Sequence, residues 1–220
     1  MNVEAVIFDM DGVLVDSESL IKKCETEVLE EQGVEVTEKD IEEHEGMATE
    51  EYFKKMMEEK HSEDFSSEEL DELAEEMVER KLELYFENMD EIKVIEGAPE
   101  SVKELSERMK VAVASNSERK MVEAVVEHLE IGEHLNAVSS FSDVDKGKPE
   151  PDVFMHAAEE MNVEPENTMV LEDSVAGTTA AVKGGFQTYR FRRESIEGVK
   201  DVVETHQEFK NKALTHRKGN

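Results

Sequence analysis

The 220-residue chain is long enough for one domain with an insertion or for two modest domains, and its 56 Asp and Glu against 25 Lys and Arg give a formal net charge of −31. That charge argues against nucleic acid and anionic membranes as partners, because both would be repelled. Apolar runs recur along the whole chain, so the acidic residues indicate a folded protein with a charged surface rather than a disordered chain.

A short apolar run at residues 3–8 predicts the first strand of the fold, a buried parallel strand that ends at Asp9. Helical patterns then alternate with further apolar runs. We expect the later strands at residues 111–115, 137–140, 169–171 and 187–191, and the helices at residues 99–109, 118–129, 151–161 and 174–183. Strands that alternate with helices in this way predict an α/β fold with a parallel sheet.

The stretch between residues 16 and 88 breaks this alternation, because it shows helical patterns and no convincing strand. The helices are expected at residues 19–32, 38–44, 49–59 and 67–86. We therefore expect two domains: a small helical bundle at 16–88, inserted after the first strand, and a sheet domain formed by 1–15 and 89–220. The sheet is expected to resume near Glu96, and the polar tail after about His206 is expected to be frayed.

Polar motifs follow three of the predicted strands, and another precedes a predicted helix. In chain order they are Asp9-Met10-Asp11-Gly12, Ser115-Asn116-Ser117, Lys146-Gly147-Lys148-Pro149 and Glu172-Asp173-Ser174. A single motif of this kind is more often a turn, a helix cap or a solvated side chain. Their joint occurrence is harder to attribute to chance, and open parallel sheets bind ligands at the carboxyl ends of their strands. We therefore expect one functional site at that edge.

The residue types in these motifs fit a magnesium-dependent phosphate site, because Mg²⁺ prefers oxygen ligands. The candidate metal ligands are Asp9, Asp11 through its backbone carbonyl, Glu172 and Asp173. Ser115 and Asn116 offer hydroxyl, amide and backbone donors to phosphate oxygens, near a helix N-terminus where the helix dipole favours an anion. Lys148 supplies a point positive charge, which the cleft of so acidic a protein needs in order to attract a phosphate.

The four motifs together resemble those of the haloacid dehalogenase-like superfamily. The run DMDGVLVDSE from Asp9 is similar to its first motif, Ser115-Asn116 to its second, Lys148-Pro149 to its third and Leu171-Glu172-Asp173-Ser174 to its fourth. Within that superfamily the chain resembles the branch of beta-phosphoglucomutase and sugar-phosphate phosphatases. Residues 154–177 are most similar to bacterial 6-phosphogluconate and 2-deoxyglucose-6-phosphate phosphatases. The resemblance implies a Rossmann-like core with an inserted helical cap, and Mg²⁺ as the cofactor.

The resemblance also implies an activity, the hydrolysis of a small phosphorylated metabolite such as a sugar phosphate. Asp9 would attack phosphorus and form an aspartyl-phosphate, while Asp11 would protonate the leaving oxygen and then deprotonate the hydrolytic water. Asp9 would therefore stay ionised and Asp11 would begin protonated, so that two carboxylates take two roles. Lys148 would complete the catalytic set. Substrate choice would depend on cap residues near Gly46, a glycine that could equally be a simple helix terminator.

A mutase of the beta-phosphoglucomutase pattern is the alternative activity. That pattern has a His twelve residues after the nucleophile, where this chain has Ile21. It also has Lys immediately before a cap glycine and Arg three residues after it, where this chain has Glu45 and Thr49 around Gly46. These departures remove groups that would hold a second phosphate, so we expect a hydrolase.

Further alternatives come from other branches of the family and from outside catalysis. A haloacid dehalogenase is argued against by Asp11, which is typical of the phosphotransferases. A phosphonate-cleaving relative would need a Schiff-base lysine in the cap, and nothing marks Lys54, Lys55 or Lys60 for that role. A non-catalytic phosphate-binding module is argued against by the complete set of motif residues.

The sequence also carries expectations about the protein's environment. Cys24 is the only cysteine, so no internal disulfide can form, and it is expected to be a small buried side chain on a helix. No basic leader and no apolar segment near the roughly 20 residues of a membrane span is present, so we expect a soluble cytoplasmic protein, a monomer or weak homodimer. The net charge of −31 suggests a halophilic source with a salt-rich cytoplasm, with an acidic mesophilic protein as the alternative.

Overall fold

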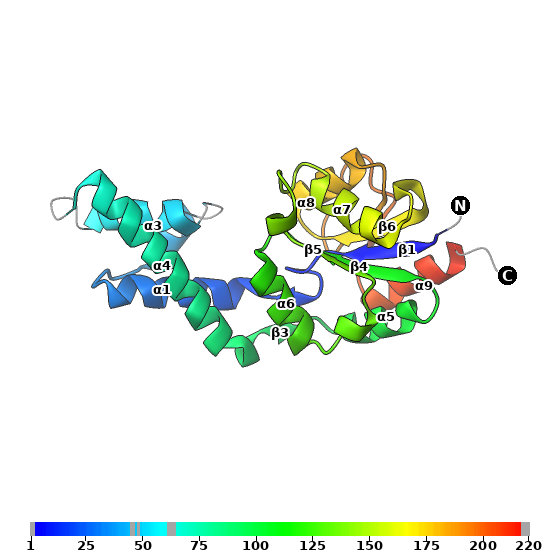
Figure 1. The fold of residues 1–220 in the computed structure, drawn as a ribbon, viewed down its shortest axis with the longest axis horizontal. Helices are drawn as coiled ribbons and strands as arrows, with labels where there is room; N and C mark the ends of the chain where they lie inside the picture. The colour runs from blue at the N-terminus through cyan, green and yellow to red at the C-terminus, as the bar shows by residue number, and fades with distance from the viewer. Residues whose placement is uncertain (1–2, 45–46, 48, 61–64, 217–220) are drawn as a thin grey trace. The chain divides into compact units, whose positions relative to one another are not determined.

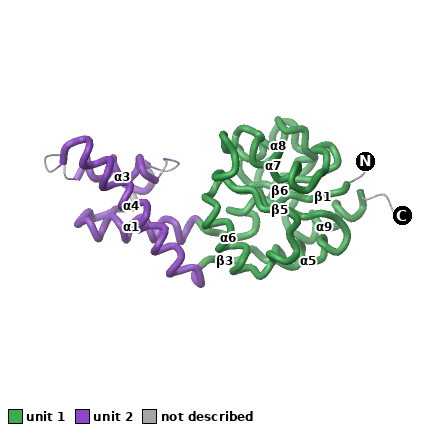
Figure 2. The backbone as a smooth tube through the Cα atoms, in the orientation of Figure 1, with its two compact units in different colours: residues 1–17, 92–220 green, residues 18–91 purple. Residues whose placement is uncertain are grey.

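The computed structural model describes residues 3–44, 47, 49–60 and 65–216. The chain divides into two compact units, residues 1–17 with 92–220 and residues 18–91 (Figure 2). We call the first the core unit and the second the helical unit. The sequence placed the two boundaries slightly earlier, after residues 15 and 88.

In the described part of the core unit, six parallel strands form one sheet in the order β5-β4-β1-β6-β7-β8. The strands are β1 (Ala5–Phe8), β4 (Lys110–Ala114), β5 (Ala137–Ser139), β6 (Thr168–Glu172), β7 (Gln187–Phe191) and β8 (Asp201–Val203). In the register of the sheet, Phe8 at the end of β1 lies opposite Val113 on one side and Leu171 on the other. The carboxyl end of β1 therefore lies between those of β4 and β6. This architecture confirms the predicted α/β fold with a Rossmann-like parallel sheet.

Helices cover both faces of this sheet (Figure 1). Helices α7 (Asp152–Met161) and α8 (Val175–Lys183) pack on one face, and α5 (Ala98–Ser106) and α9 (His206–His216) on the other. Helix α6 (Arg119–His128) follows β4. The buried residues of α7 are Val153, Phe154, Ala157, Ala158 and Met161. That spacing places one apolar stripe against the sheet, which is why the helical periodicity was readable from the sequence.

The C-terminal segment corrects one expectation. The prediction of a frayed tail after His206 is wrong, because residues 206–216 form α9, which packs behind the sheet. The strand β8, which lies just before it, adds to the sheet beside β7. The ring of Phe209 contacts the rings of Phe8 and Tyr189, with centroids 5.6 Å and 5.7 Å apart. Because only a thin apolar stripe of α9 faces the sheet, the sequence of this helix reads as polar.

A second correction concerns the return of the chain from the helical unit. The strand β3 (Lys93–Val94) pairs antiparallel with β2 (Val15–Asp16) and forms a separate two-stranded sheet. The main sheet therefore does not resume near Glu96. It resumes at Lys110, after α5.

The helical unit contains α1 (Glu18–Glu31), α2 (Glu38–Glu43), α3 (Thr49–Lys60) and α4 (Ser67–Glu87), followed by the short 3-10 helix η1 (Met89–Glu91). These bounds confirm the helices predicted for this stretch. Helix α4 packs against both α1 and α3. Its N-terminus is capped by Ser66, whose hydroxyl accepts a hydrogen bond from the Glu69 backbone N–H, as a capping box predicts. Cys24 is buried on α1, as expected.

Candidate active site

The predicted motifs meet at the carboxyl edge of the core sheet. Asp9 directly follows β1, Ser115 directly follows β4, and Glu172 is the last residue of β6. Lys148 reaches them from the segment that precedes α7. Its ammonium group, on a side chain only 4% exposed, donates to an Asp9 carboxylate oxygen, to Glu172 Oε1 at 3.1 Å and to the Ala114 carbonyl at 3.2 Å. One buried cation therefore links two of the predicted carboxylates.

Burial and charge act in opposite directions on this group of residues. Burial by itself would lower the pKa of Lys148, but the charges of Asp9 and Glu172 outweigh it and raise that pKa. Burial raises the pKa of the Asp9 carboxyl well above its usual range, and the charge of Lys148 opposes this rise. Further positive charge beside Asp9 would favour its ionised form. The site therefore has the electrostatic character of one that accepts a cation.

The carboxylates also have the geometry of a cation site. Asp9, Glu172 and Asp173 each offer an oxygen, and these oxygens lie within 4.8 Å of one another. Glu172 is already engaged, since it accepts from the Ser174 backbone N–H at 2.5 Å, from the Ser174 hydroxyl and from Lys148. Asp9 and Asp173 are thus the better candidates for direct metal ligands, and the all-oxygen donor set fits Mg²⁺.

Asp11 lies in a different environment, because its carboxylate accepts hydrogen bonds from three serine hydroxyls. Ser115 Oγ and Ser117 Oγ donate to Oδ2 at 3.3 Å and 3.1 Å, and Ser17 Oγ donates to Oδ1. Ser115 was predicted to serve a phosphate. Ser17 and Ser117 were missed, although each stands inside a motif that the sequence singled out. A hydroxyl can donate or accept, so this cage suits either protonation state of the carboxyl group.

Asn116 and Lys148 fix one another through the backbone. Asn116 Nδ2 donates to the Lys148 carbonyl at 3.2 Å, and the Lys148 backbone N–H donates to Asn116 Oδ1 at 2.8 Å. A Cβ atom on Gly147 would lie 2.7 Å from Asn116 Oδ1, so the glycine is required for this close approach. The Asn116 side chain therefore holds the lysine segment and retains one amide N–H for a ligand.

Two further glycines that the sequence did not single out for this purpose pack against the carboxylates. A Cβ atom on Gly12, which has a positive φ of 81°, would lie 2.4 Å from Asp173 Oδ2. A Cβ atom on Gly177 would lie 1.6 Å from Glu172 Oε1. The backbone after β1 and the first turn of α8 therefore come closer to the acidic residues than a residue with a Cβ atom would allow.

The remaining sequence candidates lie in the helical unit. Gly46 and Glu45 fall outside the described residues. Thr49 donates to Glu25 at 2.9 Å and accepts from Lys81 at 3.2 Å, so its hydroxyl belongs to a polar network within the unit. Ion pairing with Glu50 and Asp71 raises the pKa of Lys54, whereas a Schiff-base lysine needs a lowered one.

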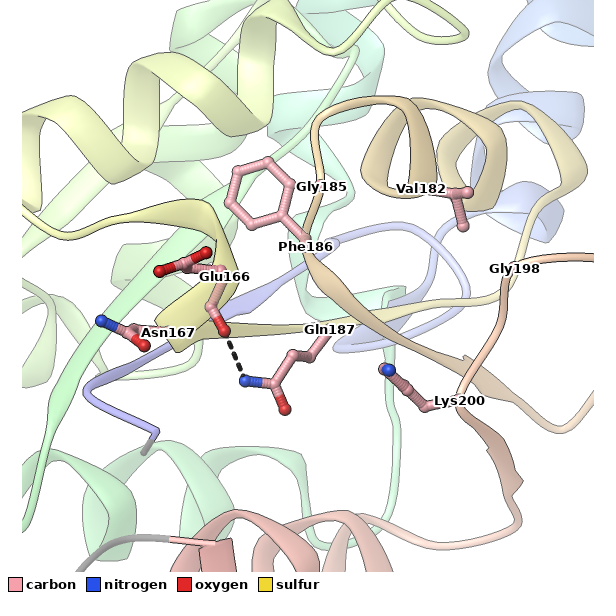
Figure 3. Close-up of a pocket in the computed structure, with 8 residues that line it drawn as sticks. All are labelled: Glu166, Asn167, Val182, Gly185, Phe186, Gln187, Gly198 and Lys200. Carbon is pink, nitrogen blue, oxygen red and sulfur yellow. Dashed lines mark hydrogen bonds between the residues drawn. The ribbon is translucent and has the colours of Figure 1, made fainter. Parts of the chain in front are cut away.

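A surface hollow of about 420 Å³ lies elsewhere on the core unit (Figure 3). It is lined by Glu166, Asn167, Val182, Gly185, Phe186, Gln187, Gly198 and Lys200. Asn167 precedes β6 and Gln187 begins β7, so the hollow lies at the amino ends of these strands, opposite the acidic cluster. None of the motif residues lines it.

No helix in the described part of the chain is long and apolar enough to cross a membrane.

Comparison with known proteins agrees with this geometry. Residues 6–191 match the family model described as haloacid dehalogenase-like hydrolase. A phosphorylated carbohydrates phosphatase of Thermotoga maritima is 31% identical over 185 residues, which cover 84% of this chain and 83% of the relative. The 6-phosphogluconate phosphatase of Escherichia coli is 27% identical over 197 residues, covering 86% and 82%. The crystal structure of a beta-phosphoglucomutase from Clostridium difficile, 24% identical, superposes with a TM-score of 0.72 over 97% of this chain and 99% of that one, a similarity of fold.

Proposed function

The chain belongs to the haloacid dehalogenase-like hydrolase family, and from that premise we propose that it hydrolyses the phosphate ester of a small phosphorylated sugar. Two relatives named as phosphatases of phosphorylated carbohydrates and of 6-phosphogluconate support this substrate class. The observation that carries the proposal is the contrast between two neighbouring carboxylates. Asp9 hydrogen-bonds to the Lys148 ammonium, whereas Asp11 hydrogen-bonds to serine hydroxyls.

These environments suit different steps of phosphoryl transfer. In our proposal an ionised Asp9 oxygen attacks phosphorus, the bond from phosphorus to the leaving oxygen breaks, and an aspartyl-phosphate forms. Asp11 gives its proton to the leaving oxygen. In the second step Asp11 takes a proton from water as that water attacks phosphorus, so that the bond between Asp9 and phosphorus breaks and inorganic phosphate leaves.

The other residues of the site would bind and orient the phosphoryl group. Lys148 Nζ and the remaining amide N–H of Asn116 would donate to its oxygens, and Ser115 would orient Asp11 through its hydroxyl. Asp9 and Asp173 would hold Mg²⁺, which supplies positive charge against the repulsion between a carboxylate and an anionic phosphate. The helical unit would act as the cap that selects the substrate.

A phosphate-release assay on a panel of sugar phosphates tests this function, with Mg²⁺ present or chelated. We expect turnover that requires Mg²⁺ and that Asp9→Asn abolishes. Asp145→Asn is the matched control, because it removes the same charge from the exposed segment before Lys148. Removal of a catalytic nucleophile usually lowers kcat by far more than tenfold. Asp9→Asn activity within about tenfold of wild type would therefore contradict the proposed role of Asp9. Conversion of beta-glucose 1-phosphate to glucose 6-phosphate would favour the mutase alternative.

A further inference from the structure

Arg190, which none of the predicted motifs includes, hydrogen-bonds to the backbone of Asp173, a candidate metal ligand. It lies on β7, opposite Glu172 in the register of the sheet, and is 7% exposed. Its Nε and Nη2 atoms donate to the backbone carbonyl of Asp173 at 3.3 Å and 3.1 Å, and Nη1 donates to the Glu194 carbonyl at 2.6 Å. The planar guanidinium therefore binds the turn after β6 and the turn after β7 at once.

We propose that Arg190 is a positioning residue for Asp173, and that it fixes the direction in which the Asp173 carboxylate faces a bound Mg²⁺. The inference rests on the proposed function, since it assumes a metal at this site. The Asp173 carboxylate packs against the backbone of Gly12, so closely that a Cβ atom there would lie 2.4 Å from Oδ2. Its carboxylate direction thus depends on its backbone, and Arg190 holds that backbone with two hydrogen bonds.

The charge of Arg190 makes this role specific. No carboxylate lies within ion-pairing distance of Arg190 among the described residues, and its hydrogen bonds go to backbone carbonyls. A buried charge without a counter-ion costs free energy, and a positive charge beside a cation site repels the cation. Electrostatics alone therefore predicts that loss of Arg190 tightens Mg²⁺ binding. The positioning role predicts instead that loss of Arg190 weakens Mg²⁺ binding.

Arg193 provides a matched comparison in the same segment. Its side chain is 61% exposed, and its Nη2 lies 3.6 Å from Asp173 Oδ2, so it approaches the carboxylate and not the backbone. Removal of Arg193 takes one positive charge from the neighbourhood of Asp173 and leaves both backbone hydrogen bonds in place. Arg190 and Arg193 thus separate the effect of charge from the effect of positioning.

Calorimetric titration of the full-length protein with MgCl₂ tests the proposal on wild type, Arg190→Met, Arg190→Lys and Arg193→Met. We expect Arg190→Met to bind Mg²⁺ about tenfold or more weakly, as for loss of other groups that orient metal ligands. Arg190→Lys should also bind weakly, because an ammonium keeps the charge but cannot make the two-pronged contact. Arg193→Met should bind as wild type or up to about threefold more tightly, since an exposed charge is screened.

A second readout is the Mg²⁺ dependence of turnover. For both Arg190 variants the Mg²⁺ concentration at half-maximal rate should rise more than kcat falls. The proposal would be overturned if Arg190→Met bound Mg²⁺ as tightly as wild type or more tightly. It would also be overturned if circular dichroism showed both Arg190 variants to be unfolded, because Arg190 would then serve the stability of the sheet. Wild-type protein that binds no Mg²⁺ would instead contradict the proposed function on which the inference rests.

Discussion

Two aspartates that are separated by one residue have unlike partners in this structure. The side chain of Asp9 shares the Lys148 ammonium with Glu172, while that of Asp11 lies among the hydroxyls of Ser17, Ser115 and Ser117. An ammonium stabilises an ionised carboxylate, whereas a hydroxyl serves both the ionised and the protonated form. These contacts support the proposed roles, with Asp9 as the nucleophile and Asp11 as the acid–base group.

Asp11→Asn tests that division. The amide keeps the size of the side chain, and it can still hydrogen-bond to the serine hydroxyls, with its NH2 group donating where a carboxylate oxygen accepted. It cannot transfer a proton, so kcat should fall by about two to four orders of magnitude. Mg²⁺ affinity should stay within about threefold of wild type, because the Asp11 carboxylate lies outside the Asp9, Glu172 and Asp173 cluster. The measurements are steady-state kinetics on a sugar phosphate and calorimetric Mg²⁺ titration. Full activity with an alkyl phosphate, whose leaving oxygen must be protonated, would contradict the assignment.

The sequence predicted which residues lie close together where a motif stands at the end of a strand. Asp9, Ser115 and Glu172 are such residues, and the parallel register brings their strand ends together. Arg190 was missed because it belongs to no motif and its partners are backbone carbonyls, which leave no pattern in a sequence. The partner of Ser17 was equally hidden, since that contact depends on the turn after β1.

Among the secondary-structure elements, α9 shows where the reading of patterns failed. His206 begins this helix, and its Nε2 donates to the Val13 carbonyl at 2.7 Å, in the turn that follows Asp11. The ring packs against Phe8 and Phe191, with centroids 5.8 Å and 5.0 Å away. A histidine in a polar tail reads as a surface residue. Only the folded structure reveals that it joins α9 to the turn that follows β1.

His206 leads to a prediction about acid stability. Burial lowers its pKa to about 4, although the hydrogen bond to Val13 opposes the shift. The unfolded chain has an ordinary histidine pKa near 6.5, so below that pH the unfolded state takes up a proton that the folded state refuses. The resulting stability is complete above about pH 6.5 and is lost as the pH falls from there towards 4, by roughly 1.4 kcal/mol per unit.

Urea unfolding of wild type and His206→Gln at pH 7 and pH 5 measures this effect. Glutamine can still donate to the Val13 carbonyl and does not titrate. Between the two pH values wild type should lose about 2 kcal/mol more unfolding free energy than the variant, whatever the other acidic groups contribute to both. Equal losses in the two proteins would show that His206 does not titrate differently on folding.

The elements that were predicted well each have a strong local signal. The strands β1, β6 and β7 are buried along their whole length, and β1 and the centre of β6 read as apolar runs. The long helices of the helical unit carry amphipathic periodicity, and α2 and α4 begin with capping boxes. By contrast, the strand β8 has only three residues and α9 has only a thin apolar stripe. Their hydrophobic patterns are too short or too weak to indicate a strand or a helix.

At the scale of the whole molecule, the net charge of −31 is the dominant feature. Like charges that lie close together on one surface disfavour the compact state. The repulsion between these charges acts over about 30 Å at 0.01 M salt and about 3 Å at 1 M salt, so added salt confines it to neighbouring groups. We therefore expect the melting temperature to rise steeply with KCl, as for a protein adapted to a salt-rich environment.

Thermal melts across KCl concentrations from about 0.05 M to about 3 M cover this screening range. A matched series in which neutral sucrose replaces KCl controls for general exclusion of solutes from the protein surface. A midpoint that rises with KCl and not equally with sucrose supports the charge argument. A midpoint that stays flat or falls with KCl would mean that the acidic surface is no adaptation to salt.

The most direct test of the central claim is a search for phosphoryl transfer to Asp9. Wild-type protein is mixed with Mg²⁺ and a sugar phosphate that it hydrolyses. The reaction is quenched in acid within one turnover, and the protein is analysed by peptide mass spectrometry. We predict one added phosphoryl group on the peptide that contains Asp9, appearing and decaying at the rates of the catalytic cycle, and absent when Mg²⁺ is chelated. Turnover without any phosphorylated peptide, or with the phosphoryl group on another residue, would contradict the account.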